Sequence, residues 1–253
     1  MKVGVQIHPQ NCSMAELRTG WQAVDALKVD SLWTWDHFFP PLYGRPDESH
    51  FEGWQILAAM AVTTSNVAQI GMLVTGCGYR NPDLLADMAR TLDHLSGGRA
   101  VLGVGAGWMD KDEIEYGYPL RSPGERLDGL AEALPRIQHR LEQLIPPPLG
   151  RLPILIGGQG ERRTLRLVAR HADMWNGYGD AETIRHKNRV IDQWCAEIGR
   201  EPSEIERTVW VERADRDLVP ALVDAGAEHV ILGLRAPYDL TEVERLREIT
   251  DRL

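Results

Sequence analysis

Short apolar runs alternate with amphipathic stretches along the whole chain, and this alternation limits the folds that the chain can adopt. The predicted strands cover residues 3–7, 31–35, 68–74, 100–104, 153–156, 172–175, 207–211 and 229–232. The predicted helices cover residues 14–27, 54–64, 84–95, 125–144, 163–170, 181–198, 218–225 and 241–253. Eight strand–helix repeats in 253 residues predict an α/β fold, a (β/α)8 TIM barrel forming one domain over residues 1–253. An open doubly wound sheet is the alternative.

Local signals mark where some of these helices begin and end. Asn81 is a predicted N-cap, because Pro82 follows it and suits the first helical position. Gly97 predicts the end of the same helix. Ser203 and Glu206 have the spacing of a capping box and predict a helical turn there.

Charge and cysteine content restrict the class of partner. The formal net charge of −9 argues against a nucleic acid or an anionic membrane as partner, so an anionic ligand needs local binding devices such as helix N-termini. No apolar run approaches the roughly 18 residues of a membrane span, and a strand follows Met1 so closely that we expect no signal peptide. Cys12, Cys77 and Cys195 are scattered, which favours packing roles over a disulfide or a metal site. These features predict a cytoplasmic protein with a small-molecule substrate.

A carboxylate beside an imidazole follows the second predicted strand. In a barrel, function resides in the loops at the C-terminal ends of the strands, where Asp36 and His37 lie. One interpretation is a proton relay, in which Asp36 accepts a hydrogen bond and His37 acts as general acid or base. The other is that Asp36 caps a turn and His37 packs within the loop. A metal site of His8, Asp36 and His37 is a weaker alternative, and we predict no metal.

Glycines strip side chains from the loops after the later strands. Gly105 and Gly107 leave one face of a strand end bare, where a flat ring can lie against backbone with Trp108 as an aromatic wall. The segment 157–160 precedes a helix, so its backbone N–H groups and the nearby Arg163 can converge on a phosphate. For each loop the alternative is a turn that simply requires glycine.

The sequence also resembles the luciferase-like monooxygenase superfamily, above all its deazaflavin (coenzyme F420) branch. The resembling segments, in order, are Trp-Asp-His at 35–37, Tyr-Arg-Asn-Pro at 79–82, Leu-Asp-His-Leu-Ser-Gly-Gly-Arg at 92–99, Gly-Val-Gly-Ala-Gly-Trp at 103–108, Ile-Gly-Gly-Gln-Gly at 156–160 and Ala-Arg-His-Ala-Asp-Met-Trp at 169–175. The resemblance implies a (β/α)8 barrel with a shortened insertion region around 145–153. It also implies coenzyme F420, or alternatively FMN, in the barrel mouth, and hydride transfer between that cofactor and an organic substrate.

The resemblance implies residue roles as well. Asp36 would bind the polar end of the ring, and His37 would assist proton transfer. Leu73 and Val74, joined by a non-prolyl cis peptide, would form a bulge behind the ring, and Thr75 would belong to the same set of cofactor contacts. The remaining implied contacts are Gly105, Ala106, Gly107 and Trp108 along the ring and Gly157, Gly158, Gly160 and Glu161 at the phosphate end.

Two positions refine these expectations. Trp108 stands where relatives acting on sugar phosphates have a glutamate, which argues against a sugar-phosphate substrate. Glu113 is expected to stabilise its loop.

Three functions stay open: an F420-dependent oxidoreductase, an FMN-dependent monooxygenase of the same fold, and a non-catalytic protein that binds a flavin or deazaflavin. Tryptophans expected on exposed helix surfaces, such as Trp194, favour a homodimer.

Overall fold

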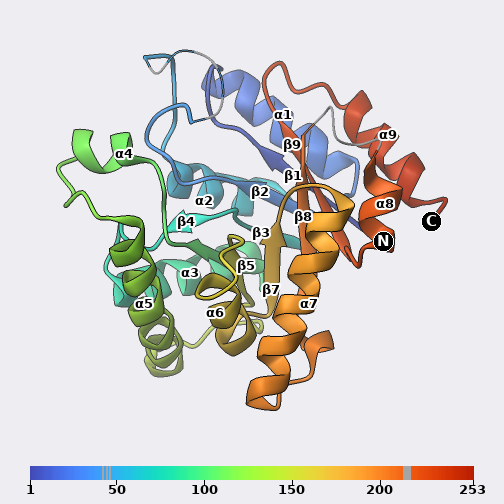
Figure 1. Ribbon diagram of the computed structural model, residues 1–253. Helices are drawn as coiled ribbons and strands as arrows, with labels where there is room; N and C mark the ends of the chain where they lie inside the picture. The colour runs from blue at the N-terminus through green and yellow to red at the C-terminus, as the bar shows by residue number, and fades with distance from the viewer. Residues whose placement is uncertain (42, 44, 46, 213–217) are drawn as a thin grey trace.

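Nine parallel strands in the described part of the chain form one sheet, which closes into a barrel (Figure 1). The computed structural model describes residues 1–41, 43, 45, 47–212 and 218–253. The strands are β1 (Lys2–Ile7), β2 (Ser31–Thr34), β3 (Gln69–Met72), β4 (Thr75–Gly76), β5 (Ala100–Gly105), β6 (Ile154–Gly157), β7 (Met174–Gly177), β8 (Glu206–Val211) and β9 (His229–Leu234). Their order is β3-β2-β1-β9-β8-β7-β6-β5-β4, and a pairing of β3 with β5 closes the ring.

The third predicted strand, 68–74, is split in two. β3 and β4 both pair with β5, so together they occupy one strand position of the barrel, interrupted at Leu73 and Val74. The closed parallel barrel therefore has eight strand positions, and the predicted TIM barrel is confirmed.

Helices surround the barrel (Figure 1). They are α1 (Met14–Ala26), α2 (Gly53–Thr63), α3 (Pro82–Ser96), α4 (Asp110–Glu115), α5 (Pro123–Gln143), α6 (Thr164–His171), α7 (Ala181–Ile198), α8 (Val219–Asp224) and α9 (Thr241–Thr250), with a 3-10 turn η1 (Pro202–Glu204). Each predicted strand and helix is present, with its ends within three residues of the prediction. The helix α4 was not predicted, because its six residues are too few to show a helical period. Across the described ranges, no helix combines the length and the apolar character needed to cross a bilayer.

The predicted ends of α3 are confirmed, whereas the capping box is wrong. The side chain of Asn81 accepts hydrogen bonds from the first-turn amides, and Gly97 ends α3 in the left-handed conformation with φ 70°. Ser203 lies in η1 and makes no side-chain cap. Glu206 is instead the first residue of β8, because pairing with β7 outweighs the local capping signal.

Side chains fill the barrel interior and its N-terminal end. The inner cluster contains Trp33, Leu73, Val101, Leu155, Met174 and Ile231, and a larger apolar layer lies between strands and helices. At the N-terminal strand ends, Ser31 Oγ lies 2.8 Å from His229 Nε2, and His229 Nδ1 lies 2.9 Å from Glu206 Oε1. Ser31 and His229 have no exposed surface, so this end of the barrel is filled.

The connection from α5 to β6 lies against α3. Arg90 Nη1 donates to the Pro146 carbonyl at 2.9 Å, and the Asp93 carboxylate accepts from the amides of Leu149 and Gly150. The short proline-rich segment is therefore fixed to the barrel wall by polar contacts.

Trp194, on α7, is half-buried rather than exposed. Its Nε1 donates to the Glu161 carbonyl at 2.8 Å, and the Arg166 guanidinium lies 5.3 Å from its ring centre. The expected exposure is wrong because these neighbours cover the indole. Trp194 thus lends no support to a homodimer, which stays a prediction.

Candidate functional site

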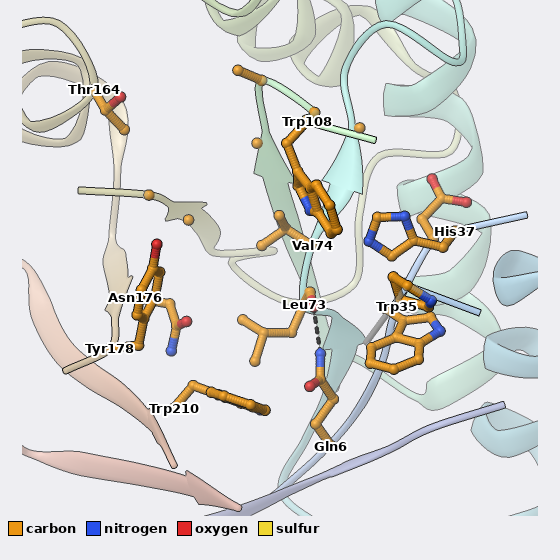
Figure 2. Close-up of a pocket in the computed structure, with 18 of the residues that line it drawn as sticks. Gln6, Trp35, His37, Leu73, Val74, Trp108, Thr164, Asn176, Tyr178 and Trp210 are labelled. Carbon is orange, nitrogen blue, oxygen red and sulfur yellow. Dashed lines mark hydrogen bonds between the residues drawn. The ribbon is translucent and has the colours of Figure 1, made fainter. Parts of the chain in front are cut away.

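A cavity of about 600 Å³ opens at the C-terminal ends of the barrel strands (Figure 2). Aromatic side chains dominate its walls, namely Trp35, Trp108, Tyr178 and Trp210. The predicted site residues that line it are Asp36, His37, Leu73, Val74, Gly105, Ala106, Gly107, Trp108, Gly157 and Gly158. Thr75, Gly160 and Glu161 do not belong to the lining that the described residues form.

The bulge at Leu73 and Val74 forms the back of the cavity. The peptide bond between them is cis, as the resemblance implied. Gln6 Nε2, from β1, donates to the Leu73 carbonyl from inside the barrel (Figure 2). A Cβ added at Gly105 would lie 2.8 Å from one Val74 methyl, and a Cβ at Gly157 would lie 3.0 Å from the other. Glycine at both positions therefore leaves the room that the Val74 side chain occupies.

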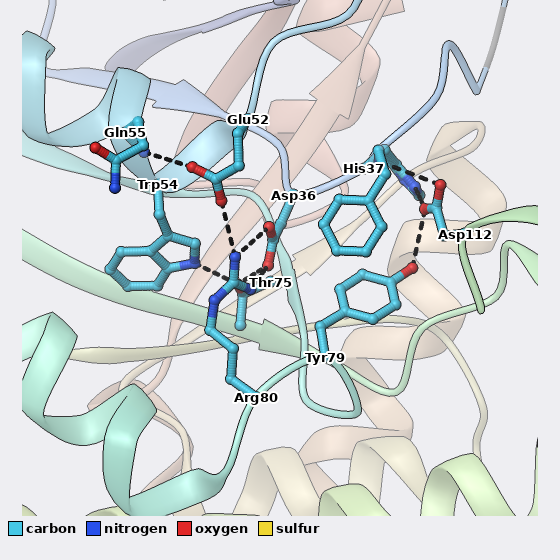
Figure 3. A network of polar contacts seen from close by, with 10 residues as sticks. Asp36, His37, Glu52, Trp54, Gln55, Thr75, Tyr79, Arg80 and Asp112 are labelled. Carbon is cyan, nitrogen blue, oxygen red and sulfur yellow. Dashed lines mark hydrogen bonds and ion pairs between the residues drawn. The ribbon is translucent and has the colours of Figure 1, made fainter. Parts of the chain in front are cut away.

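Asp36 does not pair with His37. Its carboxylate is fully buried and accepts hydrogen bonds from the Arg80 guanidinium and the Thr75 hydroxyl (Figure 3). Arg80 Nη2 lies 3.1 Å from Asp36 Oδ1 and 2.9 Å from Glu52 Oε1. Burial raises the pKa of the Asp36 carboxyl, while Arg80 and Thr75 act in the opposite direction. Of the two interpretations of this segment, the Asp36–His37 relay is therefore not formed, because the carboxylate is engaged in a buried ion pair.

Thr75 supports this ion pair from β4. Its hydroxyl donates to Asp36 and accepts from Trp54 Nε1 at 2.8 Å, and the residue has no exposed surface. Its position behind the bulge therefore does not favour the predicted contact with a cofactor.

His37 pairs instead with Asp112, a residue with no predicted role. His37 Nδ1 lies 2.8 Å from Asp112 Oδ2 (Figure 3). The same carboxylate accepts the Tyr79 hydroxyl at 2.9 Å and the Phe38 amide at 3.1 Å. Asp112 is fully buried, so His37 reaches from the cavity wall into a closed polar cluster.

Two indole rings flank the imidazole of His37 (Figure 2). The Trp108 ring centre lies 5.3 Å from that of His37 and the Trp35 ring centre lies 6.0 Å away, both edge-on. Trp108 is 58% exposed, so it forms the outer edge of the cavity. The imidazole thus lies between two indole rings at the cavity wall.

The helix α4, which carries Asp112, is anchored to α5 by ion pairs. Arg126 Nη2 lies 2.7 Å from Glu113 Oε2 and 2.6 Å from Asp110 Oδ1. Arg126 and Glu113 are both buried, and Arg121 Nη2 also lies 3.4 Å from Glu113. The expectation that Glu113 stabilises its loop is confirmed.

The predicted phosphate end is only partly assembled as expected. Gly158 lines the cavity, but its amide donates to the Asn176 carbonyl at 3.2 Å. Glu161 lies on the surface, where it pairs with His186 at 2.9 Å and Lys187 at 2.6 Å. Thr164, at the start of α6, lines the cavity instead. The Glu161 side chain is thus engaged with α7, and a phosphate contact through its backbone stays a prediction.

Several lining residues were missed. They include Gln6, Tyr79, Thr164, Trp210 and Glu212. The spacing of residues along a strand signals two of them. Trp210 and Glu212 lie two positions apart at the end of β8, as Trp33 and Trp35 do around β2, and residues with this spacing in a strand share one face of the sheet. Gln6, a polar residue within an apolar strand, carries a second signal, because a buried amide needs a partner.

His8, from the alternative metal site, and Cys77 both hold structural positions. His8 stacks on Trp35 with ring centres 4.0 Å apart, and burial lowers its pKa to about 3, so it is neutral near pH 7. Cys77 is buried away from the cavity lining, and burial raises its pKa to about 11. Within the described ranges, no three His, Cys, Asp or Glu side chains are grouped so that they could hold a metal ion.

Comparison with known proteins places this geometry in a family. The model of the luciferase-like monooxygenase family matches residues 1–214. A phthiodiolone/phenolphthiodiolone dimycocerosates ketoreductase of Mycobacterium kansasii is 26% identical over 234 residues, which cover 76% of this chain and 62% of that protein. The chain thus spans less than two thirds of the length of this relative.

Solved structures share the fold along nearly the whole chain. An F420-dependent secondary alcohol dehydrogenase in complex with an F420–acetone adduct has a TM-score of 0.82 at 18% identity, over 98% of this chain and 97% of that one. The coenzyme F420-dependent tetrahydromethanopterin reductase of Methanopyrus kandleri has a TM-score of 0.77 at 15% identity, over 99% of both chains. A long-chain alkane monooxygenase has a TM-score of 0.80 at 16% identity, over 100% of this chain and 91% of that one.

Proposed function

The chain belongs to the luciferase-like monooxygenase family, and we propose that it is an oxidoreductase that transfers a hydride between coenzyme F420 and a neutral alcohol or ketone. The observation that carries the proposal is the cavity itself, with a bare backbone face, an aromatic wall and one imidazole that is oriented by a buried carboxylate. Solved structures with this fold include F420-dependent enzymes.

The residues present fit a flat cofactor. Gly105, Ala106 and Gly107 offer backbone on one side of the cavity, and Val74 projects from the bulge behind it. A Cβ at Gly105 or Gly157 would compete with Val74 for space, so the bare face is built into the packing. Thr164, the first residue of α6, would hold the phosphate end, because a helix start offers N–H donors, and Gly158 would line the same part of the cavity without a side chain.

Bound F420 supplies a carbon that accepts or donates a hydride, and the protein's own residues handle the proton. His37 Nε2 would accept the proton of the substrate hydroxyl when an alcohol is oxidised to a ketone. It would return that proton to the carbonyl oxygen when a ketone is reduced. Trp35 and Trp108 contact the His37 ring on its edges and help to hold it in place.

The character of the lining favours an uncharged substrate. Trp108, Tyr178 and Trp210 offer apolar surface, and the described lining contains neither lysine nor arginine to bind an anionic group. An aromatic cavity without a cation favours alkyl or aryl alcohols and ketones over phosphorylated substrates.

An FMN-dependent monooxygenase is the second candidate. It is favoured by the long-chain alkane monooxygenase and by an FMN-containing Baeyer–Villiger monooxygenase, both of which share the fold. A non-catalytic binding protein is the third, and it predicts cofactor binding without turnover.

Cofactor binding and turnover separate these functions. Titrations with F420 and with FMN, followed by fluorescence, should give saturable binding of F420 and weaker binding of FMN. F420 absorbance should then report oxidation of secondary alcohols or reduction of ketones. Tighter binding of FMN would favour the second candidate, and binding of neither cofactor would overturn the proposal. A His37→Asn variant that binds F420 but no longer turns over would exclude the non-catalytic function.

A further inference from the structure

We infer that Asp112 is a positioning residue that keeps the proton of neutral His37 on Nδ1, so that Nε2 exchanges the proton with the substrate. The nature of the reaction rests on the proposed function. The tautomer rests only on the contacts of Asp112, and it can be measured without any cofactor.

The hydrogen bonds that the Asp112 carboxylate accepts assign this tautomer. An ionised carboxylate has acceptors only, so the 2.8 Å contact between Asp112 Oδ2 and His37 Nδ1 requires a hydrogen on Nδ1. The Tyr79 hydroxyl is a second donor to the same oxygen, because burial and the nearby Asp112 raise the pKa of Tyr79 and keep it protonated. The Phe38 amide donates to the other oxygen. Nε2 is then the ring nitrogen that is not engaged with the carboxylate.

The backbone that carries Asp112 is held independently of any ligand. Buried Arg126 pairs with Glu113, the residue after Asp112, and also with Asp110 on the same helix. Tyr79 is packed against Gly76, where an added Cβ would lie 2.8 Å from the tyrosine ring. Asp112 therefore meets His37 in an arrangement that is already assembled in the protein alone.

Among the titratable groups around His37, Asp112 is the anion in direct contact with the imidazole ring. His50 is neutral near pH 7, because burial and then the proximity of His37 lower its pKa to about 4. The Asp36 carboxylate is occupied by Arg80, and Tyr79 is protonated. A carboxylate in contact with an imidazole also stabilises the imidazolium that forms when Nε2 takes up a proton.

The first test is the tautomer. Long-range ¹H–¹⁵N spectra of histidine-labelled protein distinguish the two neutral tautomers, and the His37→Asn variant identifies the His37 signals by their loss. Wild-type protein above pH 8 should show His37 with its proton on Nδ1, and Asp112→Asn should shift the signals toward the other tautomer. Glu115→Gln is the matched control: it removes a carboxylate from the exposed side of α4 and should leave the His37 signals unchanged.

The second test is kinetic. Asp112→Asn should lower kcat/KM about 100-fold, the lower end of what a positioned acid–base group contributes, while the Kd of F420 changes less than twofold. The loss should appear in kcat rather than in KM, because Nε2 acts on the proton of the bound substrate and not on substrate binding. A merely structural role would instead weaken F420 binding and leave the His37 tautomer unchanged.

The outcomes of these two tests separate the assignment of the His37 proton from the proposed function. A proton on Nε2 in the wild type overturns the inference, even if Asp112→Asn fails to fold. Unchanged His37 signals and kcat/KM in a folded Asp112→Asn variant overturn it as well. A protein that binds neither F420 nor FMN but shows the expected tautomer would overturn the proposed function and leave the assignment of the proton intact.

Discussion

Arg80 contacts the buried carboxylate of Asp36 with both terminal nitrogens of its guanidinium group, and Nη2 lies 3.1 Å from Oδ1. This pair lies directly behind the bulge, because Thr75, which begins β4, donates to the same carboxylate. The ion pair thus connects the loop after β2 to the strand segment that follows the bulge. Its role in this arrangement is to fix the back of the cavity.

Removing Arg80 should destabilise the protein strongly. In Arg80→Ala, the Asp36 carboxylate would stay buried without its partner, and breaking a buried pair in this way costs about 3–5 kcal/mol. Urea denaturation should show this loss in the free energy of unfolding. The control is Arg136→Ala, which removes a half-exposed pair with Asp83 and should change that free energy by less than about 1 kcal/mol. Equal losses in both variants would contradict the role of the buried pair.

Asp25 should make stability depend on pH in the acid range. Burial tends to raise the pKa of its carboxyl, but hydrogen bonds from the amides of Asn66, Ser65 and Val67 and from the Asn66 side chain lower it overall. A folded-state pKa below the unfolded value means that Asp25 stabilises the fold above about pH 4, and that this contribution is lost as the pH falls through the folded-state value.

The Asp25→Asn variant isolates that contribution. The new NH₂ group would face the Ser65 amide and the Asn66 side-chain nitrogen, which are both donors. We expect a loss of about 1–3 kcal/mol at pH 7, and a difference from wild type that shrinks as the pH falls below 4. Thermal melts at several pH values measure it, and a difference that stays constant with pH would exclude the carboxylate as its source.

A side chain at Gly105 should disturb the cavity. The Cβ of Gly105→Ala would lie 2.8 Å from a Val74 methyl, so the Val74 side chain would have to move. We expect the Kd of F420 to rise at least about tenfold, which corresponds to about 1.4 kcal/mol of binding free energy. Gly124→Ala serves as the control, because a Cβ there meets nothing closer than 3.9 Å and lies outside the cavity lining. Fluorescence titration of both variants decides between a local and a general effect of added bulk.

Trp108 should matter more for the substrate than for folding. It is 58% exposed, so Trp108→Ala should change the free energy of unfolding by less than about 1 kcal/mol. Loss of the aromatic edge beside His37 should raise KM several-fold, and Trp108→Phe should restore most of it. Steady-state kinetics measure the effect. Unchanged KM in the alanine variant would place substrate away from this wall.

The barrel was predictable because its signals are local and repeated. Each predicted strand is a short apolar run and each predicted helix has a 3.6-residue period, so each of these elements is present in the structure with only its ends displaced. The break at Leu73 and Val74 was expected only through the family resemblance. The missed helix α4 depends on Arg126, whose buried pair with Glu113 and outer contact with the exposed Asp110 compensate for its short length.

The bare glycine face and the aromatic edge at Trp108 followed from the order of residues in single loops, because neighbours in the chain need no fold to be brought together. The partners of the charged groups did not follow in this way. Asp36 and His37 are adjacent in sequence, yet Arg80 takes the first and Asp112, 75 positions away, takes the second. A carboxylate pairs with the donor that the folded barrel places within 3 Å of it, and that choice was made by the tertiary structure alone.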